Sequence, residues 1–125
     1  MVIHQSAEDY LESILALEEH LGHGQVHSID IVNRLGFSKP SVSIAMKKLR
    51  ENGYILMAGD GAITLTDKGM EIASSVYDRH KTLTKLFVYL GVSAGQAEVD
   101  ACKAEHDLSE ETYRKIVAFV RRETN

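Results

Sequence analysis

The sequence predicts a mainly α-helical fold that contains one β-hairpin. The 125-residue chain has a single proline, and its apolar residues recur mostly at helical spacing. Two short β-prone runs flank the turn residues Gly59-Asp60-Gly61, which is the pattern of a hairpin. A chain of this length fits one domain or two small subdomains that share a core.

Three helices are predicted before the hairpin. The first covers residues 6–21, with Ser6 as its cap and acidic residues in its first turn, where they suit the positive end of the helix dipole. The second and third, residues 29–35 and 39–52, each follow a serine that can cap them. Pro40 falls in the first turn of the third helix, where its missing N–H costs little.

Helix, helix, turn, helix and hairpin, in this order, predict a winged helix-turn-helix. In such a module the third helix enters the major groove of double-stranded DNA. Serine hydroxyls can bond phosphates or base edges, lysines can bind phosphate or guanine, and proline offers an apolar contact. The candidate DNA-binding residues are Ser38, Lys39, Pro40, Ser41, Ser43, Lys47 and Lys48.

The distribution of charge supports DNA binding, although the whole chain is acidic. The net charge of −4 argues weakly against a nucleic-acid binder. Between Ser28 and Tyr54, however, five basic residues stand against two acidic ones, a local charge of +3. A basic segment in an acidic protein indicates that one face meets phosphate and another meets cations.

Three further helices are predicted after the hairpin. A long one covers residues 66–90. Ser93, with Gln96 three residues later, fits a capping box for a helix over residues 94–107, and the last helix, residues 110–123, follows a capping serine. We therefore expect two domains, residues 1–70 and 71–125.

Composition restricts the class of protein. A hydrophobic fraction of 44% and a charged fraction of 26% are typical of a soluble globular protein. No apolar stretch reaches the roughly 18–20 residues of a membrane span, and residues 1–5 lack a signal-peptide pattern. The single cysteine, Cys102, cannot form an intramolecular disulfide. We expect a cytoplasmic protein without membrane partners.

The most specific chemical signal is the run Ala101-Cys102-Lys103-Ala104-Glu105-His106. A thiolate, a carboxylate and an imidazole occur there at positions i, i+3 and i+4. If the run is helical, this spacing places all three on one face, within reach of a single ion. Carboxylates favour Mn²⁺, whereas thiolate and imidazole favour later, softer ions. The sequence therefore predicts a divalent transition-metal site at this run.

Five segments, taken in order, are similar to those of a known family. They are Glu8-Asp9-Tyr10-Leu11-Glu12, residues 38–49, Leu65-Thr66-Asp67-Lys68-Gly69, Arg79-His80 and the run that ends at His106. Over nearly the whole chain, these segments resemble the iron- and manganese-dependent repressors of the diphtheria toxin repressor type. The resemblance is strongest to the shorter, two-domain manganese-regulator branch.

The resemblance implies a homodimer that binds double-stranded operator DNA and regulates transcription, usually as a repressor. A divalent metal would tie the DNA-binding domain, residues 1–70, to a helical metal-binding and dimerisation domain, residues 71–125. By position, the metal ligands implied by the resemblance are Asp9, Glu12, His80, Cys102, Glu105 and His106.

The expected metal site is a hybrid of the two branches of the family. Asp9 matches the manganese branch, where the iron branch has methionine, and Cys102 matches the iron branch, where the manganese branch has glutamate. An ancillary site of the iron branch uses a glutamate where this chain has Thr84. Glu98, one turn before Cys102, can replace a lost ligand.

Two other functions fit parts of the same pattern. A winged-helix regulator can respond to a small organic ligand or to a protein partner, with the acidic and histidine residues merely on the surface. An enzyme could use Cys102 as a nucleophile with His106 as its base, but the sequence has no glycine-rich oxyanion loop near them. We therefore expect a regulator and not an enzyme.

Overall fold

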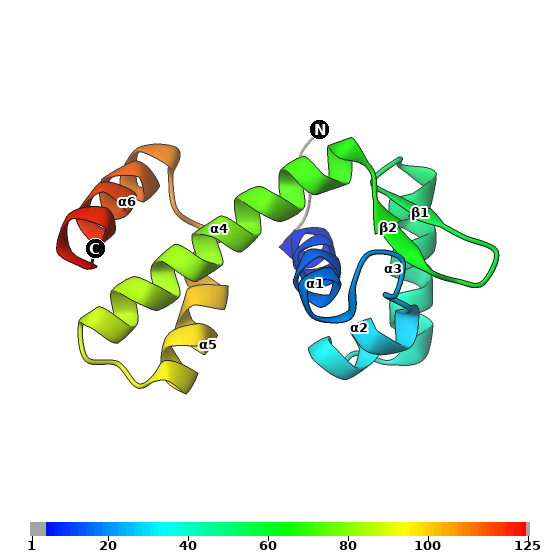
Figure 1. Cartoon of the computed structure of the whole chain (residues 1–125), viewed down its shortest axis with the longest axis horizontal. Coiled ribbons are helices and arrows are strands. Elements are labelled where there is room, and N and C mark those ends of the chain that lie inside the picture. Colours follow the sequence, from blue (N-terminus) through cyan, green and yellow to red (C-terminus); the bar gives the residue numbers. More distant parts are fainter. Residues whose placement is uncertain (1–4, 125) are drawn as a thin grey trace. The chain divides into compact units, whose positions relative to one another are not determined.

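The computed structural model describes residues 5–124, which form six helices and one two-stranded sheet (Figure 1). This arrangement confirms the predicted mainly α fold, with a winged helix-turn-helix followed by helices. The elements are α1 (Gln5–Leu21), α2 (Ser28–Leu35), α3 (Lys39–Glu51), β1 (Ile55–Met57), β2 (Ile63–Leu65), α4 (Asp67–Tyr89), α5 (Ala94–Ala104) and α6 (Glu110–Thr124). None of the described helices is both long and apolar enough to cross a membrane.

The chain divides into two compact units, which we call unit 1 (Met1–Ser75) and unit 2 (Val76–Asn125). Unit 1 holds the helix-turn-helix and the hairpin, and its core is formed by buried apolar side chains from α1, α2, α3, both strands and the segment between α1 and α2. These core residues include Leu11, Ile14, Val26, Ile31, Val42, Met46, Leu49, Ile55 and Ile63.

The predicted hairpin is confirmed. Strands β1 and β2 pair antiparallel, with Ile55 opposite Leu65, and the alternation of the strand leaves Leu56 61% exposed. In the turn between them, Asp60 Oδ1 accepts a hydrogen bond from the Ala62 N–H at 3.0 Å. Gly61 has φ +88°, a conformation in which glycine carries no Cβ penalty.

Helix starts in unit 1 agree only in part with the predicted caps. Ser38 does cap α3, since its Oγ accepts the Ser41 N–H at 3.2 Å. The prediction that Ser28 caps α2 is wrong, because α2 already begins at Ser28 and the cap position is His27. Asp30 causes this shift: its Oδ2 accepts the His27 N–H at 2.9 Å and fixes the start one residue earlier. Ser6 lies inside α1 and is not its cap.

The start of α4 is packed closely against the segment that follows α3. Thr66 Oγ1 donates to the Gly53 carbonyl at 2.6 Å and accepts the Gly69 N–H at 3.2 Å. A Cβ atom at position 69 would overlap the Tyr54 carbonyl, so only glycine allows this approach.

Unit 2 contains the C-terminal part of α4 together with α5 and α6. In the view of Figure 1, this part of α4 runs between the two shorter helices. Ser109 caps α6 as predicted, since its Oγ accepts the Thr112 N–H at 3.1 Å. The predicted capping box of α5 is wrong: the Ser93 side chain makes no capping bond, and Gln96 donates to Asp100 at 3.0 Å instead.

Candidate metal centre and nucleic-acid interface

The exposed face of α3 carries the residues predicted to bind DNA. Val42, Met46 and Leu49 are buried on the other side of the helix and hold it against the core of unit 1. This orientation places hydroxyl and ammonium groups at the surface, where they can meet phosphates and base edges. The Ser38 hydroxyl already accepts the Ser41 N–H and donates to Ser41 Oγ at 2.8 Å. The exposed residues are Ser38, Lys39, Pro40, Ser41, Ser43, Lys47 and Lys48.

One large apolar side chain interrupts this polar face. Ile44 is 58% exposed and lies between Ser43 and Lys47 on α3. It is absent from the predicted set, although its position two residues after Val42 already places it off the buried stripe. An exposed aliphatic side chain on such a helix can contact the methyl group of thymine in the major groove.

In unit 2, two imidazoles converge on one buried carboxylate. Glu105 is only 2% exposed. Its Oε2 lies 3.0 Å from His80 Nδ1, and its Oε1 lies 3.4 Å from His106 Nε2. The structure thus brings together three of the predicted metal ligands, from α4 and from the end of α5.

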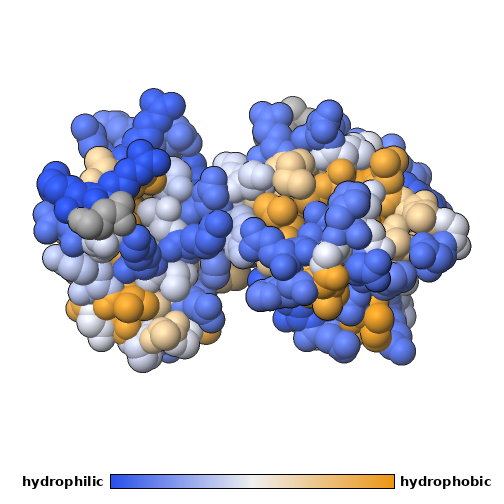
Figure 2. Space-filling model, viewed as in Figure 1, coloured by the Kyte–Doolittle hydropathy of each residue, from blue (hydrophilic) through white to orange (hydrophobic). Residues whose placement is uncertain are grey.

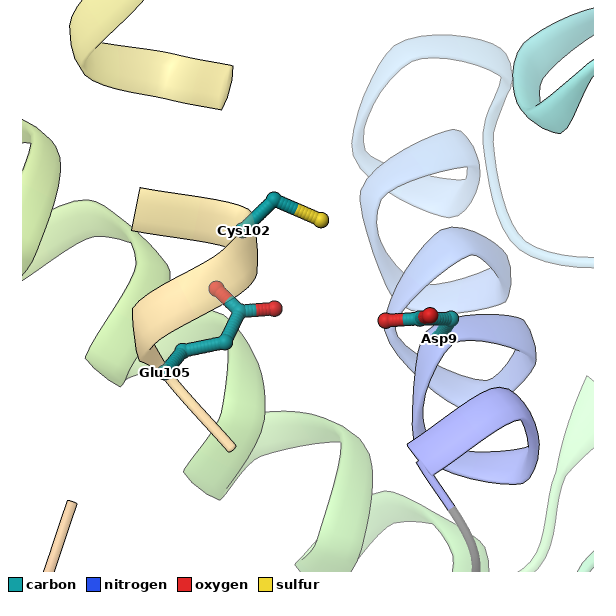
Figure 3. A group of neighbouring side chains, drawn as sticks. All are labelled: Asp9, Cys102 and Glu105. Atoms are coloured by element: carbon teal, nitrogen blue, oxygen red, sulfur yellow. The ribbon is translucent and has the colours of Figure 1, made fainter. Parts of the chain in front are cut away.

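The run that ends at His106 is not helical throughout. Helix α5 ends at Ala104, three residues earlier than predicted, and Glu105 is its cap residue. Glu105 retains helical dihedral angles (φ −61°, ψ −24°), so it stays one turn from Cys102. Figure 3 shows both side chains leaving α5 on the same side. His106 belongs to the turn that follows, so the prediction of one shared helix face is wrong for this residue.

Arg79 explains why α5 ends early. Its Nη1 donates to the carbonyls of Glu105 at 3.3 Å and Leu108 at 2.9 Å. The Asp107 N–H bonds the Ala104 carbonyl at 3.1 Å, which closes a tighter turn in place of the next helical bond. Arg79 appears in the Arg79-His80 motif, but no role is predicted for it from the sequence.

The residues of unit 2 fit a divalent metal ion. Glu105 Oε1 is buried and accepts no hydrogen bond from the described residues. A buried carboxylate is costly unless positive charge or hydrogen bonds satisfy it. With His80, His106 and the half-buried Cys102 nearby in the fold, the donor set combines oxygen, nitrogen and sulfur, which suits first-row transition metals.

The other predicted ligands lie on α1 and on α5. Asp9 and Glu12 are one turn apart on α1 in unit 1, where Glu12 is buried and Asp9 is half-buried. Figure 3 labels Asp9 on this helix. Glu98 is exposed on α5, one turn before Cys102.

Unit 2 also exposes a group of large apolar side chains. Figure 2 shows hydrophobic residues gathered where α4 ends. The residues exposed there and on α5 are Val88, Tyr89, Leu90 and Val99, with exposed fractions of 46%, 51%, 65% and 49%. Such a patch is typical of a protein–protein contact.

Comparison with known proteins assigns the chain to a family. A model for the iron dependent repressor, N-terminal DNA binding domain, matches residues 3–63. A second, for the iron dependent repressor, metal binding and dimerisation domain, matches residues 66–124.

Individual relatives agree with these matches. An uncharacterized HTH-type transcriptional regulator of Methanocaldococcus jannaschii is 36% identical over 119 residues, 93% of either chain. The transcriptional regulator MntR of Salmonella typhimurium is 34% identical over 90% of this chain and 70% of its own length.

A solved structure shows the same fold. The solved protein, a manganese-dependent transcriptional repressor in complex with manganese, is 30% identical to this chain, and the two superpose with a TM-score of 0.80 over 91% of this chain. The match covers 52% of the solved chain, so the present chain spans about half of its length. Both halves of the chain therefore match one family, and the protein belongs to the iron-dependent repressors, a family of metal-dependent transcriptional regulators, as its sequence predicts.

Proposed function

We propose that this protein is a repressor that binds operator DNA as a homodimer when Mn²⁺ or Fe²⁺ occupies its metal site. The observation that carries the proposal is the buried Glu105 carboxylate with His80 and His106 against its two oxygens. An arrangement of this kind has little use in a protein that only binds DNA, because it buries charge at a cost.

The proposed ligand set contains residues from both units. Unit 2 contributes the three converging residues and Cys102, which is one turn from Glu105 on α5. Asp9 and Glu12 complete the set in this proposal, and their support is their carboxylate chemistry and their spacing of one turn on α1. Glu98 is the substitute ligand if one of these is not used, since its exposed side chain lies on the same helix as Cys102.

The ligand chemistry favours Mn²⁺ or Fe²⁺ over other ions through coordination number and not through affinity. Three carboxylates suit Mn²⁺, whereas the Cys102 thiolate favours Fe²⁺ and the later ions. The name of MntR, a relative at 34% identity, and that of the similar manganese-dependent repressor support Mn²⁺. A site with more than four ligands disfavours Zn²⁺, which prefers tetrahedral coordination.

In the proposed mechanism, carboxylates that share one site repel one another and leave the two units loosely docked. A bound divalent ion supplies the positive charge that offsets this repulsion. The docked units of each protomer then hold the two recognition helices of a dimer at successive major grooves, roughly 34 Å apart. Because metal binding and DNA binding are linked, operator DNA must tighten metal binding by the same factor as metal tightens DNA binding.

The exposed apolar side chains of unit 2 support the homodimer. Val88, Tyr89, Leu90 and Val99 would become buried in an interface between two copies. A two-fold dimer presents two copies of α3 to the two half-sites of a palindromic operator.

Anaerobic titration of metal-stripped protein with Mn²⁺ and, separately, Fe²⁺ tests the proposal. We expect saturable binding that is lost in Glu105→Ala and kept in the matched control Glu111→Ala, whose exposed side chain lies on α6. We also expect DNA binding, measured by anisotropy with duplexes selected from a random pool, to require the metal. Equal DNA affinity with and without metal refutes the proposal and leaves a winged-helix regulator that answers to another signal.

A further inference from the structure

Arg79 joins three consecutive parts of unit 2. From α4, its Nη1 donates to the carbonyls of Glu105 and Leu108, at 3.3 Å and 2.9 Å. Its Nη2 donates to Glu110 Oε2 at 3.0 Å, in the first turn of α6. The guanidinium also lies over the Tyr113 ring, 4.7 Å from the ring centroid. The side chain is only 15% exposed, so these contacts are largely shielded from water.

The turn that Arg79 holds is the segment that carries Glu105 and His106. Glu105 donates its N–H to the Ala101 carbonyl at 3.0 Å, which attaches the turn to α5 at its beginning. The carbonyls of Glu105 and Leu108, at the two ends of the turn, are both acceptors for Arg79. Arg79 therefore contacts both ends of the turn that joins α5 to α6.

An arginine suits this role because its guanidinium presents five N–H donors in one rigid plane. One plane can reach two carbonyls and a carboxylate at once and still stack on an aromatic ring. A lysine at the same position offers a compact ammonium on a flexible stem, which cannot reproduce the fork.

We propose that Arg79 is a positioning residue for the metal site. It holds the turn over residues 105–108 so that the Glu105 carboxylate meets both His106 and His80, the next residue on α4. The inference rests on the proposed function, and it assigns to Arg79 a role in metal affinity without direct contact to the ion. Metal–ligand distances tolerate only about 0.2 Å, so a small displacement of this turn weakens binding.

The test is calorimetric titration of Mn²⁺ into Arg79→Gln, Arg79→Lys and wild type. We expect Arg79→Gln to lose about 10- to 100-fold in affinity, as removal of a residue that orients a metal ligand usually does. Arg79→Lys should fall between Arg79→Gln and wild type. Glu110→Gln is the matched control: it removes the ion pairs of Glu110 with Arg79 and Arg114, whose carboxylate side is 62% exposed, and leaves both carbonyl contacts of Arg79 intact. Its affinity should stay within about twofold of wild type.

A second readout does not depend on metal. In the metal-free proteins, the amide NMR chemical shifts of residues 105–108 should differ from wild type in Arg79→Gln and match wild type in Glu110→Gln. Thermal unfolding reports whether each variant is folded. Wild-type affinity in a folded Arg79→Gln overturns the inference. If that variant does not fold, Arg79→Lys decides, and wild-type affinity together with unchanged amide shifts overturns it. Absence of Mn²⁺ and Fe²⁺ binding to wild type instead overturns the proposed function itself.

Discussion

Replacement of Lys47 by alanine should make DNA binding less sensitive to salt. Each α3 exposes three lysines, Lys39, Lys47 and Lys48, so a dimer can place six ammonium groups near phosphates. If each neutralises one phosphate, the slope of log affinity against log salt is about −5.4 in wild type and about −3.6 in Lys47→Ala. Between 50 and 200 mM salt, wild type should then lose about 2,000-fold in affinity and the variant about 150-fold.

Fluorescence anisotropy with one selected duplex, at saturating Mn²⁺ and at four or more salt concentrations, measures this slope. Lys115→Ala is the matched control, because Lys115 is exposed on α6 in unit 2 and should leave the slope unchanged. An unchanged slope in Lys47→Ala would show that Lys47 does not face phosphate. Equal losses of slope in both variants would point instead to a diffuse effect of net charge.

Three further outcomes are expected. Wild type should select operators with a thymine in each half-site, a preference worth about 1–3 kcal/mol per base pair, and Ile44→Ala should lose this preference in selection from a random pool. Replacement of that thymine by uracil, which lacks the methyl group, should weaken DNA binding by wild type but not by Ile44→Ala. Leu11→Ala, at a fully buried core position, should lower the free energy of unfolding by about 2–5 kcal/mol in urea titration. Leu56 is 61% exposed, so Leu56→Ala should change the free energy of unfolding by less than about 0.5 kcal/mol. Peroxide should abolish metal binding by oxidising the Cys102 thiolate, and Cys102→Glu should keep its metal binding after the same treatment.

The helix-turn-helix is predictable from sequence because its signals are local. Ser38 caps α3 through the N–H of Ser41, three residues away, and Pro40 occupies the first turn where no N–H is needed. The spacing of Val42 and Met46 determines which side of the helix is buried, and therefore which side can meet DNA. The same spacing identifies Ile44 as an exposed residue that can contact bases.

The start of α2 and the start of α5 show where local signals compete. Both Ser28 and Ser93 have the chemistry of a cap. Asp30 reaches back to the His27 N–H and moves the start of α2 by one residue. At Ser93, the expected partner Gln96 bonds Asp100 along the helix surface instead. In both cases the acceptor of the bond that forms is a carboxylate, which makes a stronger hydrogen bond than a neutral serine hydroxyl.

The end of α5 depends on a contact that is distant in sequence. Arg79 lies 26 residues before Glu105 and 29 before Leu108, so the turn that places His106 follows from the packing of α4 and not from the run that contains it. Neighbouring residues on a helix point about 100° apart, which lets Arg79 and His80 reach different parts of one turn. Arg79 binds the backbone of that turn while His80 meets the Glu105 side chain. Both residues of the Arg79-His80 pair thus contact the one turn that carries Glu105.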